Sequence, residues 1–291
     1  MHDVIIVGGS YAGLAAAMQL GRARRDVVVI DGGKRRNATV EHAHGLLGFD
    51  GEAPAAIAAK GREQVRKYST VKLVEGEVAE ARREGDGFVV QTKDATFAAR
   101  KLILATGVRD ELPEIPGLRD RWGKSVFSCP YCDGYERQMG KLGVIASGDH
   151  VTHYATIVSQ WGSETTLFSD AEPPPGVRIE RDPIAEVRDA PAGIEVVTRA
   201  GRRYELSGLF VGTHVRVPGN FAQSLGLELE TFPTGSFYKT DPRTKETSVP
   251  GVYAAGDATT PMHALSFAIA DGVRAGIGTH QSLVMGATAK H

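Results

Sequence analysis

Short apolar runs recur along the chain, and each is followed by small or turn-forming residues. Val4–Val7, Val27–Ile30 and Leu102–Ala105 are continuous apolar segments of strand length, far too short to span a membrane. Between the first two lies Gly8–Gly13, followed by Leu14–Leu20 with the spacing of a helix. The pattern therefore predicts an α/β chain that begins with a strand–turn–helix–strand unit.

The same order returns in the middle of the chain. Lys141–Ile145 predicts a strand, Tyr154–Gln160 a helix and Thr165–Phe168 the next strand. A hairpin is expected around Ala200–Gly201, and a closing helix from Ala264 to about Met285. Pro113, Pro116 and Gly117 mark a domain boundary, and Lys239–Asp241 marks a return to the first domain.

The first turn has the chemistry of a dinucleotide-binding unit. Gly8 suits the tight turn, Gly13 allows close helix–strand packing, and Asp31 ends the second strand, where it can hold a ribose hydroxyl. A pyrophosphate would rest on the helix N-terminus. Ser10 departs from the motif, because glycine usually stands where the backbone approaches the phosphates most closely. In the basic loop that follows, Arg36 and Asn37 either contact the nucleotide or face solvent.

The chain has two cysteines, and both lie in Cys129-Pro130-Tyr131-Cys132-Asp133. Pro130 suits the first position of a helix, which places the cysteines one turn apart, close enough for a disulfide. A helix N-terminus stabilises the reactive thiolate, and Asp133 can move protons to and from the pair. A zinc site would need further ligands that the spacing does not provide, and a structural disulfide across so short a loop constrains the unfolded chain little. We therefore expect a redox-active pair and no metal.

Composition narrows the function classes. At 291 residues, two domains are expected, with 42% hydrophobic and 24% charged residues typical of a soluble globular protein. A formal net charge of −1 implies no general attraction to nucleic acid or to a membrane. The first strand follows Met1 almost directly, so no signal peptide is expected, and two cysteines without a disulfide framework fit a cytoplasmic protein.

These motifs in this order resemble the low-molecular-weight thioredoxin reductase family of FAD flavoproteins over essentially the whole chain. The resemblance implies an α/β fold of two Rossmann-like three-layer domains, in which a discontinuous FAD domain surrounds an NAD(P)-domain-like insertion that carries the CxxC pair. The expected limits are 1–113 and 238–291 for the FAD domain and 114–237 for the central dithiol domain. A homodimer is also implied.

The resemblance assigns site residues by position. Cys132 would face the flavin, Cys129 would exchange with substrate, and Asp133 would be the acid/base group. The implied FAD-binding residues are Gly8, Ser10, Gly13, Asp31, Arg36, Asn37, Val78, Ala105, Thr106, Gly107, Gly256, Asp257, His263 and Ala264. His44 and His263 are alternative proton carriers, since an imidazole can act as a base near neutral pH.

The second turn departs from the family pattern. Where relatives carry an intact glycine motif and a His-Arg-Arg stretch for NADPH, this chain has Ala146–Val151 and Phe168–Asp170. Loss of the cationic partners of a 2′-phosphate should weaken NADPH binding by at least a few kcal/mol. The chain thus looks similar to the subgroup that keeps the flavin–dithiol chemistry without the pyridine nucleotide. That subgroup comprises dithiol oxidases that use oxygen, and thioredoxin reductases that use ferredoxin or another donor.

We therefore expect an FAD-dependent dithiol/disulfide oxidoreductase, thioredoxin reductase-like, that does not use NADPH efficiently. Its partner would be a thioredoxin-like protein or a small-molecule dithiol or disulfide. Two alternatives stay open at this point. One is a conventional NADPH-dependent thioredoxin-disulfide reductase, and the other is a non-catalytic flavoprotein that senses redox state.

Overall fold

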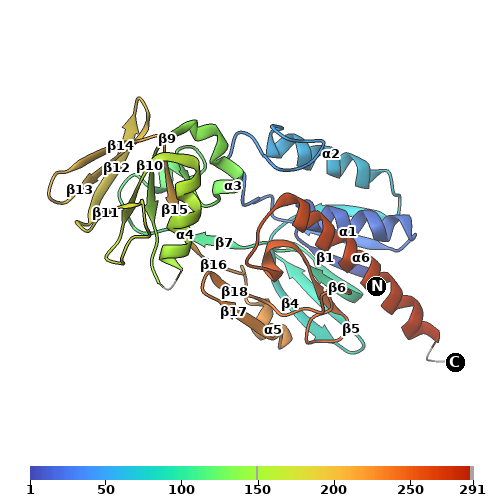
Figure 1. Ribbon diagram of the computed structural model, residues 1–291. Coiled ribbons are helices and arrows are strands. Elements are labelled where there is room, and N and C mark those ends of the chain that lie inside the picture. Colours follow the sequence, from blue (N-terminus) through green and yellow to red (C-terminus); the bar gives the residue numbers. More distant parts are fainter. Residues whose placement is uncertain (149, 289–291) are drawn as a thin grey trace. The chain divides into compact units, whose positions relative to one another are not determined.

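The computed structural model describes residues 1–148 and 150–288, the last two of these by backbone alone. The apolar runs near the N-terminus form one sheet (Figure 1). Its order is β3 (Val71–Glu75), β2 (Val27–Asp31), β1 (His2–Val7), β6 (Thr96–Leu104), β5 (Gly87–Thr92) and β4 (Val78–Glu84), and β19 (Val252–Ala254) pairs with β6. The strands β1, β2, β3, β6 and β19 pair in parallel, whereas β4 and β5 add an antiparallel edge. The predicted strands of this region are confirmed.

Helices cover one face of this sheet. α1 (Tyr11–Arg22) and α6 (Leu265–Thr288) pack on each other, and α2 (Pro54–Arg66) lies beside α1. Small residues permit the close approach of α1 and α6: a Cβ on Gly272 would overlap the carbonyl oxygen of Ala12. Ile6, Leu20 and Val29 are fully or almost fully buried in the core on this side. The closing helix that the sequence predicts is present.

The opposite face has its own core. Val28, Leu102 and Tyr238 are buried there together with side chains of the short helix α5 (Phe221–Leu225). The hairpin β17 (Leu229–Phe232) and β18 (Gly235–Tyr238) follows α5 in the chain. This part of the protein therefore has three layers, with helices on one side of the sheet and β-structure and α5 on the other.

The middle of the chain forms a second parallel sheet. Its strand order is β11 (Arg178–Glu180), β10 (Gly162–Phe168), β9 (Met139–Ile145), β15 (Gly208–Val211) and β8 (Val126–Phe127). α4 (Val151–Val158) packs on one face through Ala155 and Val158. An antiparallel sheet of β12 (Ile184–Ala190), β13 (Gly193–Thr198) and β14 (Arg203–Leu206) packs on the other face. The expected fold class, α/β with two Rossmann-like three-layer parts, is confirmed.

The bounds of α4 and β10 differ most clearly from the expectation. α4 begins at Val151, three residues before the predicted start, and ends at Val158. Val151 is buried, so packing against the sheet extends the helix toward the turn. β10 also begins earlier, at Gly162, because it pairs along its whole length with β9.

The chain divides into two compact units. The first comprises Met1–Ala38, Pro54–Arg109 and the segment from Arg216 onward, and the second comprises Thr39–Ala53 and Asp110–Val215. β7 (Arg109–Glu111) and β16 (His214–Arg216) lie where the chain passes between them. Thr39–Ala53 follows β2 in the sequence, yet it belongs to the second unit. The assignment of 1–113 and 238–291 to FAD binding and of 114–237 to the dithiol domain stays a prediction.

Candidate active site

The cysteine pair lies at the start of a short helix in the second unit. α3 (Pro130–Asp133) begins with Pro130 in its first turn, as the sequence predicts, and Cys129 is its N-cap residue with extended backbone. Cys129 and Cys132 form a disulfide, with their Cα atoms 5.3 Å apart. The backbone N–H of Cys132 donates to the carbonyl oxygen of Cys129 over 3.1 Å. Local helix geometry alone thus brings the two sulfur atoms together.

Asp133 directly follows the disulfide, and its carboxyl group is tuned toward neutral pH. Burial raises the pKa of Asp133 to about 6, because a charged carboxylate is costly away from water. The charge of Glu136 also raises this pKa, while Arg137 and His44 oppose the shift. A carboxyl group with such a pKa can both accept and release a proton under ordinary conditions, as the acid/base assignment requires.

Tyr154 of α4 holds the backbone in place just before the disulfide. Its hydroxyl donates to the carbonyl oxygen of Ser128 over 2.8 Å, one residue before Cys129. Burial raises the pKa of Tyr154 far above its ordinary value, and the nearby Asp133 carboxylate adds to the shift. Tyr154 therefore stays neutral and acts as a hydrogen-bond donor. This role could not be predicted from the sequence, since an aromatic residue on a helix is more often part of a core.

The glycine turn of the first unit is shaped for a phosphate group. Gly8 has a φ of +102°, and a Cβ there would overlap the carbonyl oxygen of Ala105. A Cβ on Gly13 would in turn overlap the carbonyl oxygen of Gly8. Within the described residues, the Ser10 side chain makes no capping bond to α1. The first N–H groups of α1 are thus available to an anion at the helix N-terminus.

Asp31 ends β2 beside the same turn. A Cβ on Gly9 would lie 2.8 Å from the Cβ of Asp31, so the turn passes close to this side chain. Arg62 of α2 forms an ion pair with the Asp31 carboxylate, and both side chains are mostly buried, at 21% and 14% exposure. Sequence reasoning missed Arg62, because no local motif links an arginine on an amphipathic helix to a strand end 31 residues away.

Three of the residues expected at the cofactor meet in one cluster. Arg36 donates to the Asp257 carboxylate over 3.2 Å, and its Nη1 lies 2.6 Å from Nδ1 of His263. Asp257 sits in the turn after β19, where Gly256 has a φ of +77°. Ala264 follows His263, and its carbonyl oxygen accepts from the N–H of Ala268 in the first turn of α6. Segments more than 200 residues apart in sequence thus join here.

The remaining expected residues lie elsewhere in the first unit. Asn37 does not join the Arg36 cluster but donates to the hydroxyl of Tyr11 over 3.2 Å. Its Oδ1 is buried and has no hydrogen-bond partner among the residues described. Val78 begins β4, and Ala105, Thr106 and Gly107 follow β6, where Gly107 has a φ of +64°. The backbone N–H of Ala105 donates a hydrogen bond to the carbonyl oxygen of Val7, so this strand end lies beside the glycine turn.

The described part of the chain shows neither a metal-binding group of side chains nor a membrane-spanning helix. No group of three His, Cys, Asp or Glu side chains in residues 1–148 and 150–288 is placed to hold a metal ion. In the same residues, no helix has both the length and the apolar character needed to cross a membrane.

Comparisons with known proteins agree on one family. The family model described as pyridine nucleotide-disulphide oxidoreductase matches residues 2–272. Thioredoxin reductase sirT of Leptosphaeria maculans is 31% identical, with 96% of this chain and 94% of that protein covered. Thioredoxin reductase tcpT of Claviceps purpurea is 32% identical, over 88% of this chain and 86% of its own. The crystal structure of an oxidoreductase from Agrobacterium tumefaciens is 44% identical, with a TM-score of 0.91 over 98% of this chain and 99% of that one.

Proposed function

This chain belongs to the pyridine nucleotide-disulphide oxidoreductase family, and from that premise we propose a dithiol/disulfide oxidoreductase that makes little use of NADPH. The family and its thioredoxin reductase members are FAD flavoproteins, so FAD is the cofactor. The observation that carries the proposal is the Cys129–Cys132 disulfide beside Asp133. In the same unit, carboxylates line the cavity at the end of β10.

The first unit offers groups suited to each part of FAD. The glycines of the turn between Gly8 and Gly13 let the backbone pack closely at the N-terminus of α1, whose first N–H groups would hold the pyrophosphate. Asp31 offers a carboxylate for ribose hydroxyls, with Arg62 keeping it in place. Charged groups for the remaining part of FAD would come from the cluster of Arg36, Asp257 and His263. The first turn of α6 would supply backbone N–H groups. When bound, FAD supplies a two-electron acceptor or donor for the cysteine pair.

The cysteine pair exchanges electrons with substrate through sulfur chemistry. A substrate thiolate attacks Sγ of Cys129, forming a mixed disulfide and releasing Cys132 as a thiolate. The second substrate sulfur then attacks the mixed disulfide, which frees the Cys129 thiolate and leaves the substrate oxidised. The substrate loses two electrons, and the cysteine pair gains them. Asp133 takes up or delivers the protons that the sulfur atoms exchange.

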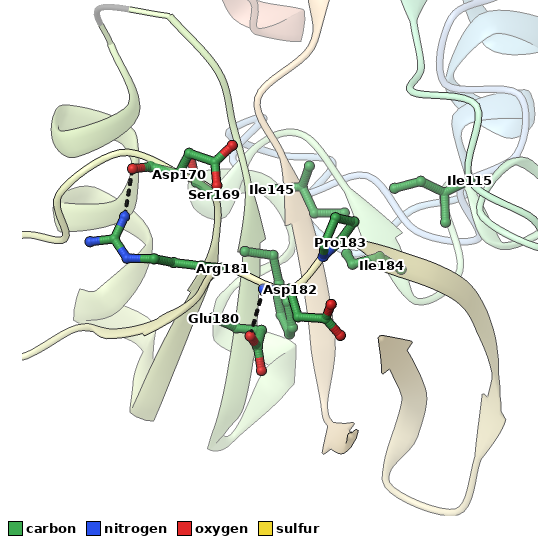
Figure 2. A pocket seen from close by; sticks show the side chains of 10 residues that line it. Ile115, Ile145, Ser169, Asp170, Glu180, Arg181, Asp182, Pro183 and Ile184 are labelled. Carbon is green, nitrogen blue, oxygen red and sulfur yellow. Dashed lines mark hydrogen bonds between the residues drawn. The ribbon is translucent and has the colours of Figure 1, made fainter. Parts of the chain in front are cut away.

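The cavity at the end of β10 is unsuited to a 2′-phosphate (Figure 2). It has a volume of 190 Å³, and Asp170, Glu180 and Asp182 line it. Arg181 is the cation of this lining, but its guanidinium donates to the carbonyl oxygen of Asp170 over 2.6 Å and to Glu172 over 2.7 Å. Carboxylates at this edge repel a dianionic phosphate, and the neighbouring arginine is already engaged.

Glu180 keeps its negative charge in this cavity. Arg202 donates two hydrogen bonds of 2.6 Å to its carboxylate, and Tyr204 donates a further one. These bonds lower the pKa of Glu180 to about 2, with the Arg202 hydrogen bonds the largest cause. The anion at this position therefore persists at any pH at which the enzyme would work. Arg202 balances this charge, so the pair adds little repulsion, but it engages a second arginine that could otherwise meet a 2′-phosphate, which supports the proposal that the cavity does not serve NADPH.

Nucleotide binding to the oxidised holoenzyme tests this point, with 2′,5′-ADP as the probe of the 2′-phosphate. We expect a Kd of about 1 mM or weaker, because the lost charge-assisted hydrogen bonds amount to a few kcal/mol. Asp170→Asn combined with Asp182→Asn should tighten binding, since it removes two repelling charges. Asp189→Asn, an exposed site outside the cavity, should not. Isothermal titration calorimetry measures all three, and a Kd of about 1 μM for the unchanged protein would contradict the proposal.

The proposal includes a thioredoxin-like protein or a small-molecule dithiol or disulfide as partner, and a cytoplasmic homodimer. The relatives sirT and tcpT, both named as thioredoxin reductases, support a thioredoxin reductase-like activity. They also favour the second candidate, a conventional NADPH-dependent thioredoxin-disulfide reductase. Tight binding of 2′,5′-ADP would favour that candidate over the first.

A further inference from the structure

The segment 39–53 places a histidine next to the residues that follow α3, the helix that carries the cysteine pair and is called the dithiol helix below. This segment belongs to the second unit, and Nε2 of His44 lies 3.4 Å from Oε1 of Glu136. Nδ1 of the same imidazole lies 3.6 Å from Oδ1 of Asp50. Glu136 belongs to a single helical turn, Tyr135–Arg137, that directly follows α3. A histidine between two carboxylates thus contacts Glu136, which lies three residues after Asp133.

Glu136 has one engaged and one unengaged oxygen. Oε1 contacts His44, whereas Oε2 is buried and has no hydrogen-bond partner in the described part of the chain. A buried carboxylate oxygen without a donor is costly, and a protonated carboxyl group beside it would relieve that cost. Asp133 lies within electrostatic reach, because the charge of Glu136 raises the pKa of Asp133.

The other groups that face Asp133 cannot carry its proton away. Arg137, on the same turn as Glu136, donates to the Asp133 carbonyl over 3.2 Å and to the Ser207 carbonyl over 3.4 Å, and an arginine stays protonated. Tyr154 of α4 donates its hydroxyl proton to Ser128 and stays neutral. Glu136 and His44 are therefore the titratable partners that remain for Asp133.

Asp50, at the outer end of this set, is the most exposed of the side chains. The Glu136 and His44 side chains are 32% and 24% exposed, and the Asp50 side chain is 68% exposed. An imidazole can accept a proton on one nitrogen and release one from the other near neutral pH. The set thus leads from the half-buried acid at the disulfide to a carboxylate in water.

We propose that Glu136 and His44 are positioning residues of the dithiol site that conduct the proton of Asp133 to and from water. The inference rests on the proposed function, in which the reduced cysteine pair is reoxidised by FAD. That step removes two electrons and two protons from the two thiols. A proton taken up by the Asp133 carboxylate passes to Glu136, then to His44, and leaves through Asp50 or water, so that Asp133 is ionised again for the next turnover.

The contact between His44 and Glu136 could instead serve only to hold residues 39–53 against α3. Substitutions that keep its hydrogen bonds but remove the titrating group distinguish these two roles. Glu136→Gln and His44→Gln keep size and hydrogen bonding while removing the titrating group. His42→Gln is the matched control, because His42 lies on the same segment and contacts Gly51 and Glu41 rather than Glu136.

The first readout is the titration of Asp133 in the oxidised holoenzyme, followed by infrared difference spectroscopy of its carboxyl band. Loss of the Glu136 charge should lower the pKa of Asp133, and loss of His44 should raise it, so the two variants shift in opposite directions. His42→Gln should leave the titration unchanged. Unshifted titrations, or shifts of the same sign in both variants, would overturn the inference.

The second readout is the rate of flavin reduction by dithiothreitol in weakly buffered solution. We expect His44→Gln and Glu136→Gln each to slow it about tenfold, below the 10²–10⁴ range of a directly acting acid or base. Added imidazole should restore most of the rate in His44→Gln, and His42→Gln should stay within about twofold of the unchanged enzyme. Equal rates in all variants, or a loss that imidazole does not restore, would also overturn the inference. If the unchanged enzyme shows no flavin reduction by the dithiol, the proposed function fails instead, and the titration still decides on Glu136 and His44.

Discussion

Replacing Cys132 with serine abolishes the reduction of bound flavin by a dithiol while FAD stays bound. A serine hydroxyl has nearly the shape of the thiol but forms no disulfide with Cys129. Cys129 is then a free thiol, which is already reduced and can accept no electrons from the dithiol, so none reach the flavin through this pair. The rate should fall by at least about a thousandfold, as expected when a covalent participant is removed. Anaerobic stopped-flow absorbance in the flavin band measures it.

Two controls separate loss of chemistry from loss of structure in this variant. The flavin content per chain should equal that of the unchanged protein, because the expected FAD-binding residues lie in the first unit and Cys132 lies in the second. Dithionite, which reduces flavin directly, should bleach both proteins alike. A Cys132→Ser enzyme that the dithiol still reduces at more than about one tenth of the normal rate would contradict the assigned role of this cysteine.

Replacing Asp133 with asparagine slows the same reaction and stabilises the fold at pH 8. Asparagine keeps the shape of the side chain but cannot take up a proton, so the rate should fall about 10²- to 10⁴-fold. The rise in rate that accompanies ionisation of a carboxyl group with a pKa of about 6 should disappear from the pH profile. Asp120→Asn, at an exposed position of the same unit, should change neither the rate nor the profile.

The stability change in Asp133→Asn has a definite sign. The pKa of Asp133 is about 6 in the folded protein and about 3.8 in the unfolded chain, so the folded state holds its proton to higher pH. Stability therefore falls as pH rises from about 4 to 6, and above pH 6 the wild-type carboxylate costs up to about 3 kcal/mol. Asparagine does not incur this cost, and thermal unfolding at pH 8 should show a higher Tm. A lower Tm at pH 8 would contradict burial as the source of the shifted pKa, and a loss of rate without any change in pH profile would contradict Asp133 as the ionising group.

The parts of the fold that the sequence predicts are those set by local chemistry. Continuous apolar runs such as Val4–Val7 form strands because every side chain is buried, and Gly8 and Gly13 are required by the close approach of the backbone around the first turn. Pro130 starts a helix because its fixed φ and missing N–H suit the first helical position, which is a local property of the chain. The cysteine pair could therefore be predicted with its geometry, as could the closing helix.

The parts that could not be predicted depend on contacts between distant residues. Nothing local to Arg62 indicates that it pairs with Asp31, and the place of residues 39–53 in the second unit depends on packing across more than 80 residues of sequence. His44 was expected as a candidate proton carrier, but its partner could not be predicted because Glu136 lies 92 positions later (136 − 44). The cluster of Arg36, Asp257 and His263 had been expected residue by residue, but its hydrogen bonds could not be.

The most direct measurement is an anaerobic titration of the flavin absorbance with two reductants, dithiothreitol and NADPH, on separate samples of the same holoenzyme. The proposed function predicts that excess dithiothreitol bleaches the flavin completely, whereas near-stoichiometric NADPH leaves it oxidised. Rapid bleaching by micromolar NADPH, or a flavin that the dithiol cannot reduce, would contradict it.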